Sequence, residues 1–134
     1  MANVNVVLNS ASIQVLDLTT NLFRINSPVG TITLAATAVF YEPYFQAAAS
    51  PGSGLSFPAG VLFVVYVKNL STTNNIQVQF GVAGGAQLTA AQSPLLLPGG
   101  AFIYWNTVET SGGIVILTLI GSAANTPAEV LLAG

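Results

Sequence analysis

The stretch Asn75-Ile76-Gln77-Val78-Gln79-Phe80 alternates apolar and polar residues strictly. In an extended strand, successive side chains point to opposite faces, so this order places its three apolar residues on one face and its two glutamines on the other. A sheet with one face against a core and the other against polar surroundings requires this pattern. The stretch is the clearest strand signal in the chain, and it sets the expectation of a β fold.

The residues around this strand continue the β pattern. Residues 61–67, Val-Leu-Phe-Val-Val-Tyr-Val, are apolar on both faces, which predicts a central strand whose outer face is covered by a loop or by a neighbouring subunit. The polar residues 69–74 join it to the alternating strand, and this predicts a hairpin. Residues 101–105 and 114–120, joined by a polar stretch, predict a second hairpin.

Shorter strand candidates complete the chain: residues 4–8, 12–18, 22–25, 31–39 and 129–132. About eight or nine strands at this spacing predict an all-β protein, a single antiparallel β-sandwich over residues 1–134, either jelly-roll or immunoglobulin-like. No segment combines helix caps with a 3.6-residue period. Residues 47–58, rich in Ala, Ser, Gly and Pro, are expected to form a long surface loop.

Charge is scarce in this sequence. Only six of the 134 residues are charged, the net charge is −2, and 52% of the residues are hydrophobic. A small soluble monomer usually devotes roughly 25–35% of its surface to charged residues. The surface must therefore be built from uncharged residues or be covered by other copies of the chain, and we expect a homo-oligomer.

The composition also excludes several function classes. The chain has no Cys and no His, so thiolate chemistry, disulfides and the commonest general base and metal ligand are absent. We expect no enzyme activity, no catalytic residues, no cofactor and no metal. Two basic residues cannot neutralise a run of phosphates, which argues against nucleic acid as a partner. No stretch supplies the roughly 20 uninterrupted apolar residues of a membrane-spanning helix, and the first residues lack the features of a secretion signal.

Aromatic residues are the candidates for contacts with partners. Four of them surround Glu42-Pro43, and these are Phe40, Tyr41, Tyr44 and Phe45. So many large rings in an irregular segment exceed what one end of a small sandwich can bury, so we expect them in a subunit interface. Tyr104 and Trp105 are the alternative candidates, as rings that stack on a ligand, although strand alternation places at least one of them in the core.

Two polar motifs have ordinary explanations beside chemical ones. Lys68 and Ser71 contain the groups of a Ser-Lys dyad, but a lysine at a strand end commonly extends into solvent. Asn69-Leu70-Ser71 matches the N-glycosylation sequon, which has no expected use without secretion.

The second half of the chain carries a resemblance. Its successive segments are Val67-Lys68-Asn69-Leu70, Ile76-Gln77-Val78-Gln79-Phe80-Gly81, Leu97-Pro98-Gly99-Gly100-Ala101-Phe102-Ile103-Tyr104-Trp105 and Leu117-Thr118-Leu119-Ile120-Gly121-Ser122-Ala123-Ala124. Over residues 61–134 this succession resembles small β-sandwich virion proteins of tailed bacteriophages. The resemblance implies a part that decorates capsids or forms fibres, spikes or tail parts, commonly as trimers or larger multimers.

Composition and resemblance together predict a viral structural protein on the exterior of a virion or in an accessory position, as decoration, cement or a fibre-like component. The expected partners are further copies of the chain, with a trimer favoured, and other capsid or tail proteins. The alternative is a carbohydrate- or cell-surface-binding module. Aromatic rings exposed in a groove would favour the alternative, whereas rings buried between subunits would favour the structural role.

Overall fold

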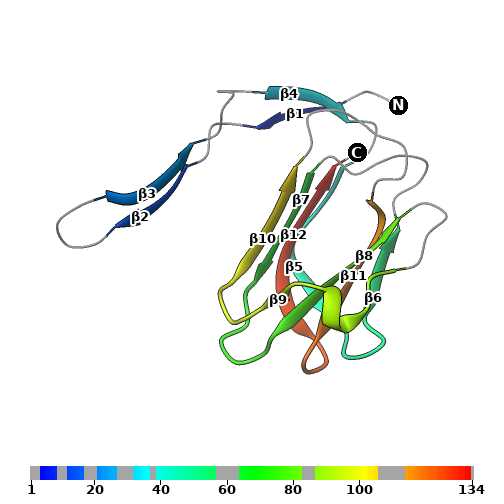
Figure 1. The fold of residues 1–134 in the computed structure, drawn as a ribbon. Helices are drawn as coiled ribbons and strands as arrows, with labels where there is room; N and C mark the ends of the chain where they lie inside the picture. The colour runs from blue at the N-terminus through cyan, green and yellow to red at the C-terminus, as the bar shows by residue number, and fades with distance from the viewer. Residues whose placement is uncertain are drawn as a thin grey trace.

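The computed structural model describes residues 4–8, 12–16, 21–26, 32–36, 39–56, 64–82, 87–105 and 114–133. Within these ranges the chain is almost entirely extended (Figure 1). Twelve strands are present there, and the only helical element among them is one 3-10 turn, η1 (Ala90–Gln92).

Eight of the strands form two four-stranded sheets (Figure 1). The first has the order β10-β7-β12-β5, and the second has the order β6-β11-β8-β9. All neighbours are antiparallel. Their bounds are β5 (Val39–Ala47), β6 (Ser53–Ser56), β7 (Val64–Asn69), β8 (Ile76–Val82), β9 (Leu95–Leu96), β10 (Ala101–Trp105), β11 (Ile114–Gly121) and β12 (Thr126–Ala133). The expected antiparallel β-sandwich is confirmed, and β7 is a central strand as its two apolar faces predict.

The pairing order identifies the kind of sandwich. In chain order the first of the eight strands pairs with the last, the second with the seventh, the third with the sixth and the fourth with the fifth. These nested pairs are those of a long double ribbon wound into two sheets, which is the jelly-roll arrangement. Of the two topologies compatible with the sequence pattern, the chain therefore adopts the jelly roll.

Both predicted hairpins are wrong. The strands β7 and β8 lie in opposite sheets, and so do β10 and β11. Consecutive strands are usually neighbours, but the jelly roll separates nearly all of them, and among its eight strands described here only β8 and β9 are consecutive and paired. Residues 70–75 and 106–113 are long enough to cross the roughly 10 Å between packed sheets, so connection length alone does not reveal the difference.

The segment 47–58 is not only a loop, because it contains the edge strand β6, which pairs with β11. Small residues allow this close packing. Gly52 has a φ of +93°, and a Cβ atom there would lie 2.6 Å from Cγ1 of Ile120. Glycine is the residue that tolerates both the backbone conformation and the contact.

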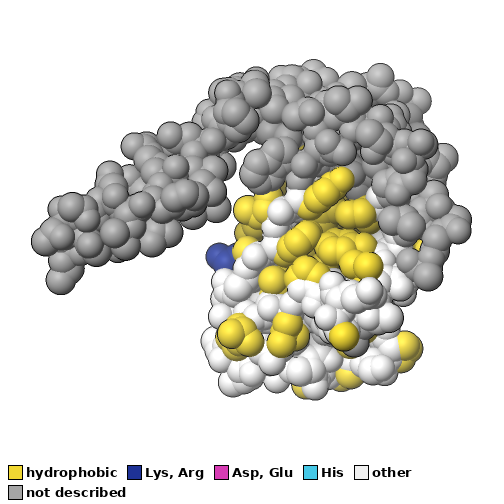
Figure 2. Space-filling model, viewed as in Figure 1, with side chains coloured by type: hydrophobic (Ala, Val, Ile, Leu, Met, Phe, Trp, Pro, Cys, Tyr) yellow, Lys and Arg dark blue, Asp and Glu magenta, His cyan; other side chains and the backbone are white. Residues whose placement is uncertain are grey.

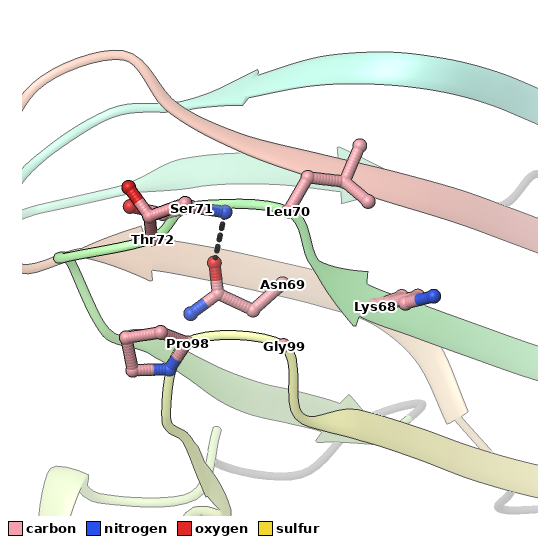
Figure 3. Close-up of a pocket in the computed structure, with 7 residues that line it drawn as sticks. All are labelled: Lys68, Asn69, Leu70, Ser71, Thr72, Pro98 and Gly99. Carbon is pink, nitrogen blue, oxygen red and sulfur yellow. Dashed lines mark hydrogen bonds between the residues drawn. The ribbon is translucent and has the colours of Figure 1, made fainter.

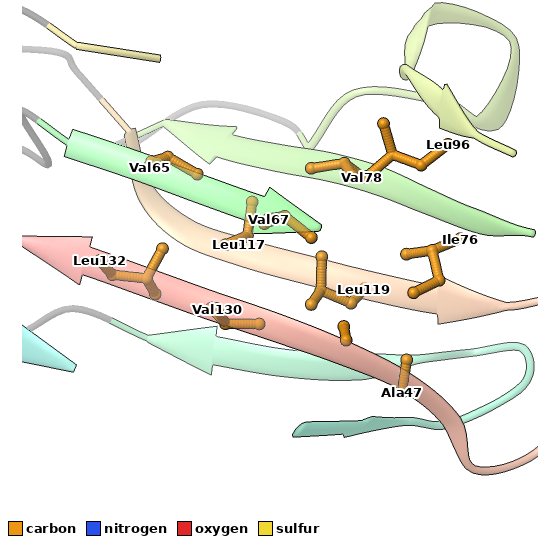
Figure 4. Close-up of a cluster of buried hydrophobic side chains, with 11 residues drawn as sticks. Ala47, Val65, Val67, Ile76, Val78, Leu96, Leu117, Leu119, Val130 and Leu132 are labelled. Atoms are coloured by element: carbon orange, nitrogen blue, oxygen red, sulfur yellow. The ribbon is translucent and has the colours of Figure 1, made fainter. Parts of the chain in front are cut away.

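The core lies between the two sheets (Figure 4). Eleven buried apolar residues form it, and these are Ala47, Val65, Val67, Ile76, Val78, Leu96, Leu117, Leu119, Ala128, Val130 and Leu132. The prediction from the alternating strand is confirmed for Ile76 and Val78, which are fully buried. Phe80 is half-buried against the same core, and its ring lies 5.1 Å from that of Phe102 across the two sheets.

The strands before β5 belong to neither of these sheets. β1 (Val4–Leu8) pairs with β4 (Ile32–Ala36), and β2 (Ser12–Leu16) pairs with β3 (Asn21–Asn26), all antiparallel. These strands thus form two separate two-stranded sheets, β1 with β4 and β2 with β3 (Figure 1). The expected strands are present, but they pair with one another, and the sandwich is made by β5 to β12.

Candidate interface on the outer face of one sheet

The four aromatic residues around Glu42-Pro43 all lie in β5, at the edge of the first sheet. They divide into two pairs. Phe40 and Phe45 are half-buried, pack against the core and meet edge to face, with ring centroids 6.4 Å apart. Tyr41 and Tyr44 are 57% and 71% exposed. Two of the four therefore serve the core, and two remain free for contacts with a partner.

A β-bulge in β5 produces this division. Ala128 pairs with Phe45 and Val130 with Glu42, so β5 has one residue more than β12 between these pairs. The extra residue shifts the alternation and turns the Phe45 side chain toward the core. The bulge is held locally, because the Tyr44 amide donates a hydrogen bond of 3.2 Å to Oε1 of Glu42.

The strand register places Tyr41 in a row of residues that crosses all four strands of the first sheet. Tyr41 is the partner of Leu131, Leu131 that of Tyr66, and Tyr66 that of Ile103. Residues paired across strands share a face, and the neighbours of Leu131 on β12, Val130 and Leu132, point into the core. We call Tyr41, Leu131, Tyr66 and Ile103 the outer row. Ile103 is 57% exposed, and Leu131 and Tyr66 are half-buried.

Charge lies at one side of the outer row. Glu129 and Lys68 are partners in the register between β12 and β7, two residues beyond Leu131 and Tyr66. Burial raises the pKa of the Tyr66 hydroxyl, and its hydrogen bond to the Glu129 side chain raises it further, together with the nearby negative charge. The Tyr66 hydroxyl therefore lies beside the Glu129 carboxylate and keeps its proton at neutral pH.

The outer face of the second sheet differs from this one. Its middle row pairs Gln79 with Thr118, and Thr118 with Gly54. The Gln87 side chain donates a hydrogen bond of 2.6 Å to Oγ1 of Thr118. Exposed apolar residues occur on this sheet, for example Leu95 and Ile116, but the polar row separates them. Figure 2 shows a described surface of mainly uncharged polar and hydrophobic groups, with one cationic side chain in view.

The alternative aromatic candidates lie on β10. Tyr104 is the partner of Val65, is half-buried and packs against the core, so the expectation that one of the two faces inward is confirmed. Trp105 is the partner of Val64, and its side chain lies outside the described residues. Tyr104 therefore offers little ring surface to a ligand.

A hollow of about 430 Å³ lies at the end of β7 and contains the two polar motifs (Figure 3). Two of its polar side chains, those of Asn69 and Ser71, are hydrogen-bonded within the chain. The Asn69 side chain is fully buried, donates from Nδ2 to the carbonyl oxygens of Asn74 at 2.8 Å and Leu96 at 3.1 Å, and accepts from the Ser71 amide at 2.9 Å. This nitrogen is inaccessible for glycosylation in the folded chain.

Ser71 has a similar structural role in this loop. Its Oγ accepts hydrogen bonds from the amides of Thr73 at 3.2 Å and Asn74 at 2.8 Å. The Lys68 amine points away from it (Figure 3). The two residues are neighbours along the chain but do not form a catalytic pair.

Other functional chemistry is sparse. In the described ranges, no three acidic side chains lie close enough together to hold a metal ion. In the same ranges, no helix has the length and hydrophobicity needed to cross a membrane. No protein-family model, curated protein or solved structure matches the chain. The outer row is thus the feature on which a functional hypothesis must rest.

Sequence reasoning found one member of the outer row, Tyr41, and missed the other three. A signal was present for two of them. Tyr66 lies two residues before Lys68 on β7, and Leu131 lies two residues after Glu129 on β12. Residues two apart in a strand share a face, so each of these apolar residues lies on the same face as a charged one. What the sequence does not contain is the register that joins these strands into one row.

Proposed function

We propose that this chain is a structural subunit of a virus particle, on the exterior of the virion or in an accessory position, and that copies assemble through uncharged apolar surface. The observation that carries the proposal is the outer row. A continuous line of Tyr41, Leu131, Tyr66 and Ile103 crosses one sheet of a jelly roll in a chain with only six charges.

Three arguments support it. Jelly rolls are common among viral capsid domains, although fold alone does not fix function. A continuous row of apolar and aromatic side chains on one face is typical of an interface, whereas scattered apolar residues are not. Tyrosine anchors contribute strongly to such contacts because they bury a large area with little loss of side-chain freedom.

The test compares assembly with folding in matched variants. The double variant Tyr41→Ser/Ile103→Ser removes the two most exposed members of the outer row. Ile116→Ser is the control, since it makes the same kind of change at a 39% exposed residue on the other sheet. Sedimentation velocity reports native mass, and denaturant unfolding reports stability.

We expect the wild-type protein and the Ile116 variant to be multimers of equal mass. The double variant should lose mass while keeping a cooperative unfolding transition. A wild-type protein that remains monomeric at high concentration would refute the proposal.

Jelly rolls also occur in lectin domains, and the two exposed tyrosines of β5 keep a carbohydrate-binding module as the second candidate. A glycan array with wild-type protein and a Tyr44→Ser variant separates the two functions. Specific glycan binding that depends on Tyr44, by a protein that does not self-assemble, would favour the lectin-like role.

A further inference from the structure

The sandwich has four edge strands in the described ranges, and three of them are protected against the addition of a further strand. β5 contains Pro43 and a bulge, β6 has only four residues, and β9 has only two. Proline, bulges and very short strands are common means by which natural sheets prevent edge-to-edge association. The fourth edge strand, β10, has none of these features.

β10 has the composition of a strand that can accept a partner. Its five residues, Ala-Phe-Ile-Tyr-Trp, include no charge and no proline, and its register with β7 has no irregularity. Branched and aromatic residues favour strands, and five residues is an ordinary strand length. β10 lies at the border of the first sheet, and no described strand pairs with its other side (Figure 1). A regular, uncharged edge of this kind is a template for a further strand.

The hydrogen-bond pattern identifies the backbone groups that β10 offers. The Asn69 amide donates to the Gly100 carbonyl oxygen at 2.8 Å. These two residues lie next to the first pair of the register between β7 and β10, so that pair is of the non-hydrogen-bonded kind, and the two kinds alternate from there. The amide and carbonyl groups of Phe102 and Tyr104 therefore face β7, whereas those of Ile103 point away from it, toward the open edge.

The side chains of β10 also leave surface for a neighbour. Phe102 and Tyr104 pack against the core but are only half-buried, and Ile103 is 57% exposed on the outer face. A residue on an edge strand has a cross-strand neighbour on one side only. A strand added beside β10 would supply the missing neighbour on both faces of the sheet.

A second copy of β10 fits this edge in the antiparallel sense. Ile103 is the central residue of the five, so a two-fold axis opposes Ile103 to its own counterpart, and Phe102 to Tyr104 of the other copy. Apolar residues then face apolar residues, and aromatic rings face aromatic rings, on each side of the joint. Lys68 pairs with the first residue of β10, so the two Lys68 side chains lie at opposite ends of the joint and no like charges meet.

We propose that β10 pairs antiparallel with β10 of a second copy, so that the first sheets of two copies form one continuous sheet. The inference rests on the proposed assembly of copies and adds a contact made by the backbone. Directly paired residues share a face, so Ile103 of each copy continues the outer row of the other. The partner is a second copy because the edge is complementary to itself and has no charged group that would select a charged peptide.

Cysteine substitution tests the pairing directly, because the chain has no cysteine of its own. Opposed residues of a hydrogen-bonded pair have Cα atoms about 5.5 Å apart, which a disulfide can span. A chain with Ile103→Cys can form a disulfide only with another copy. Tyr41→Cys is the matched control, since Tyr41 is also 57% exposed and lies in the same row at the opposite, protected edge. Both variants are oxidised in a glutathione buffer at equal dilution, and non-reducing electrophoresis measures the linked dimer.

A proline variant separates backbone pairing from side-chain contact. Ile103→Pro removes the outward amide and leaves the bonds to β7 in place, as edge strands tolerate. Ile103→Ala is its control, because it shortens the same side chain and keeps the amide. Sedimentation velocity compares the native masses of the two variants.

We expect several-fold more linked dimer from Ile103→Cys than from Tyr41→Cys, and a smaller native mass for Ile103→Pro than for Ile103→Ala. If the wild-type chain is multimeric but the two cysteine variants give equal dimer, the strand pairing is wrong and the assembly proposal stands. Equal masses of a folded Ile103→Pro and Ile103→Ala also overturn the pairing, and if Ile103→Pro does not fold, the cysteine comparison decides. A monomeric wild-type chain overturns the assembly proposal and, with it, this one.

Discussion

Replacing Asn69 with alanine tests how the two sheets are held together at one end. Asn69 ends β7 in the first sheet, and its buried amide bonds to Leu96 in the second sheet and to two residues of the loop between β7 and β8. Asn69→Ala leaves two carbonyl oxygens and one amide without their partner.

Each buried group left unpaired costs about 1–3 kcal/mol, and water can reach the loop partners more easily than Leu96. We therefore expect a loss of about 3 kcal/mol in the free energy of unfolding. A domain of this size has only about 5–15 kcal/mol in total, so the change is large. Urea unfolding followed by tryptophan fluorescence and circular dichroism measures it.

Two further variants make the result specific. Thr72→Ala, an exposed change in the same loop, should stay within about 0.5 kcal/mol of wild type. Asn69→Asp keeps the acceptor for the Ser71 amide but directs a carboxylate at two carbonyl oxygens. This arrangement raises the pKa of the introduced carboxyl, so the variant should be most stable at acidic pH and lose stability as pH rises. If Asn69→Ala lowered the free energy of unfolding by less than about 1 kcal/mol, the hydrogen bonds of the Asn69 amide would not hold the two sheets together at this end.

Three other outcomes follow from named contacts. Phe45→Ala should lower the free energy of unfolding by about 3 kcal/mol because the ring packs on the core, whereas Tyr44→Ser should change it by less than about 0.5 kcal/mol because the ring is exposed. Equal effects of the two variants in urea unfolding would contradict the assignment of Phe45 to the core and Tyr44 to the surface. Gly52→Ala should cost more than the roughly 1 kcal/mol expected for Gly99→Ala, since both have positive φ but only Gly52 has atoms within contact of a new Cβ. Because folding raises the pKa of Tyr66, the protonated hydroxyl contributes its full stabilisation below about pH 10, and this contribution to the free energy of unfolding is lost as pH rises through the pKa of the folded state. A Tyr66→Phe variant should therefore lose less stability than wild type at alkaline pH, as measured by urea unfolding at several pH values.

The strand positions were largely predictable because they depend on local alternation. Ile76, Val78 and Phe80 face the core as their spacing requires, and β7 is central as its two apolar faces indicate. Strand pairing depends instead on contacts between residues far apart in sequence, such as Leu131 with Tyr41 and Tyr66. No local pattern encodes those contacts, and the usual preference for hairpins pointed to the wrong partners.

The aromatic cluster shows the same limit at the level of one strand. The sequence concentrates four rings around Pro43 but gives no sign that an extra residue shifts the alternation. Without the bulge, residues 40, 42, 44 and 46 would share a face, and Tyr44 would point inward in place of Phe45. The interface prediction therefore stays a prediction for Tyr41 and Tyr44, while Phe40 and Phe45 also have a core role.

The same bulge bears on how copies can associate. An exposed edge strand is a template for adding a strand from another molecule, and natural sheets interrupt such edges with proline or a bulge. β5 has both at Pro43, and Glu42 accepts a hydrogen bond from the Tyr44 amide. Strand addition along β5 is therefore disfavoured, even though its outward tyrosines are the most exposed aromatic groups described. An interface at this edge must use side chains on the face of the sheet, and that is where the outer row begins.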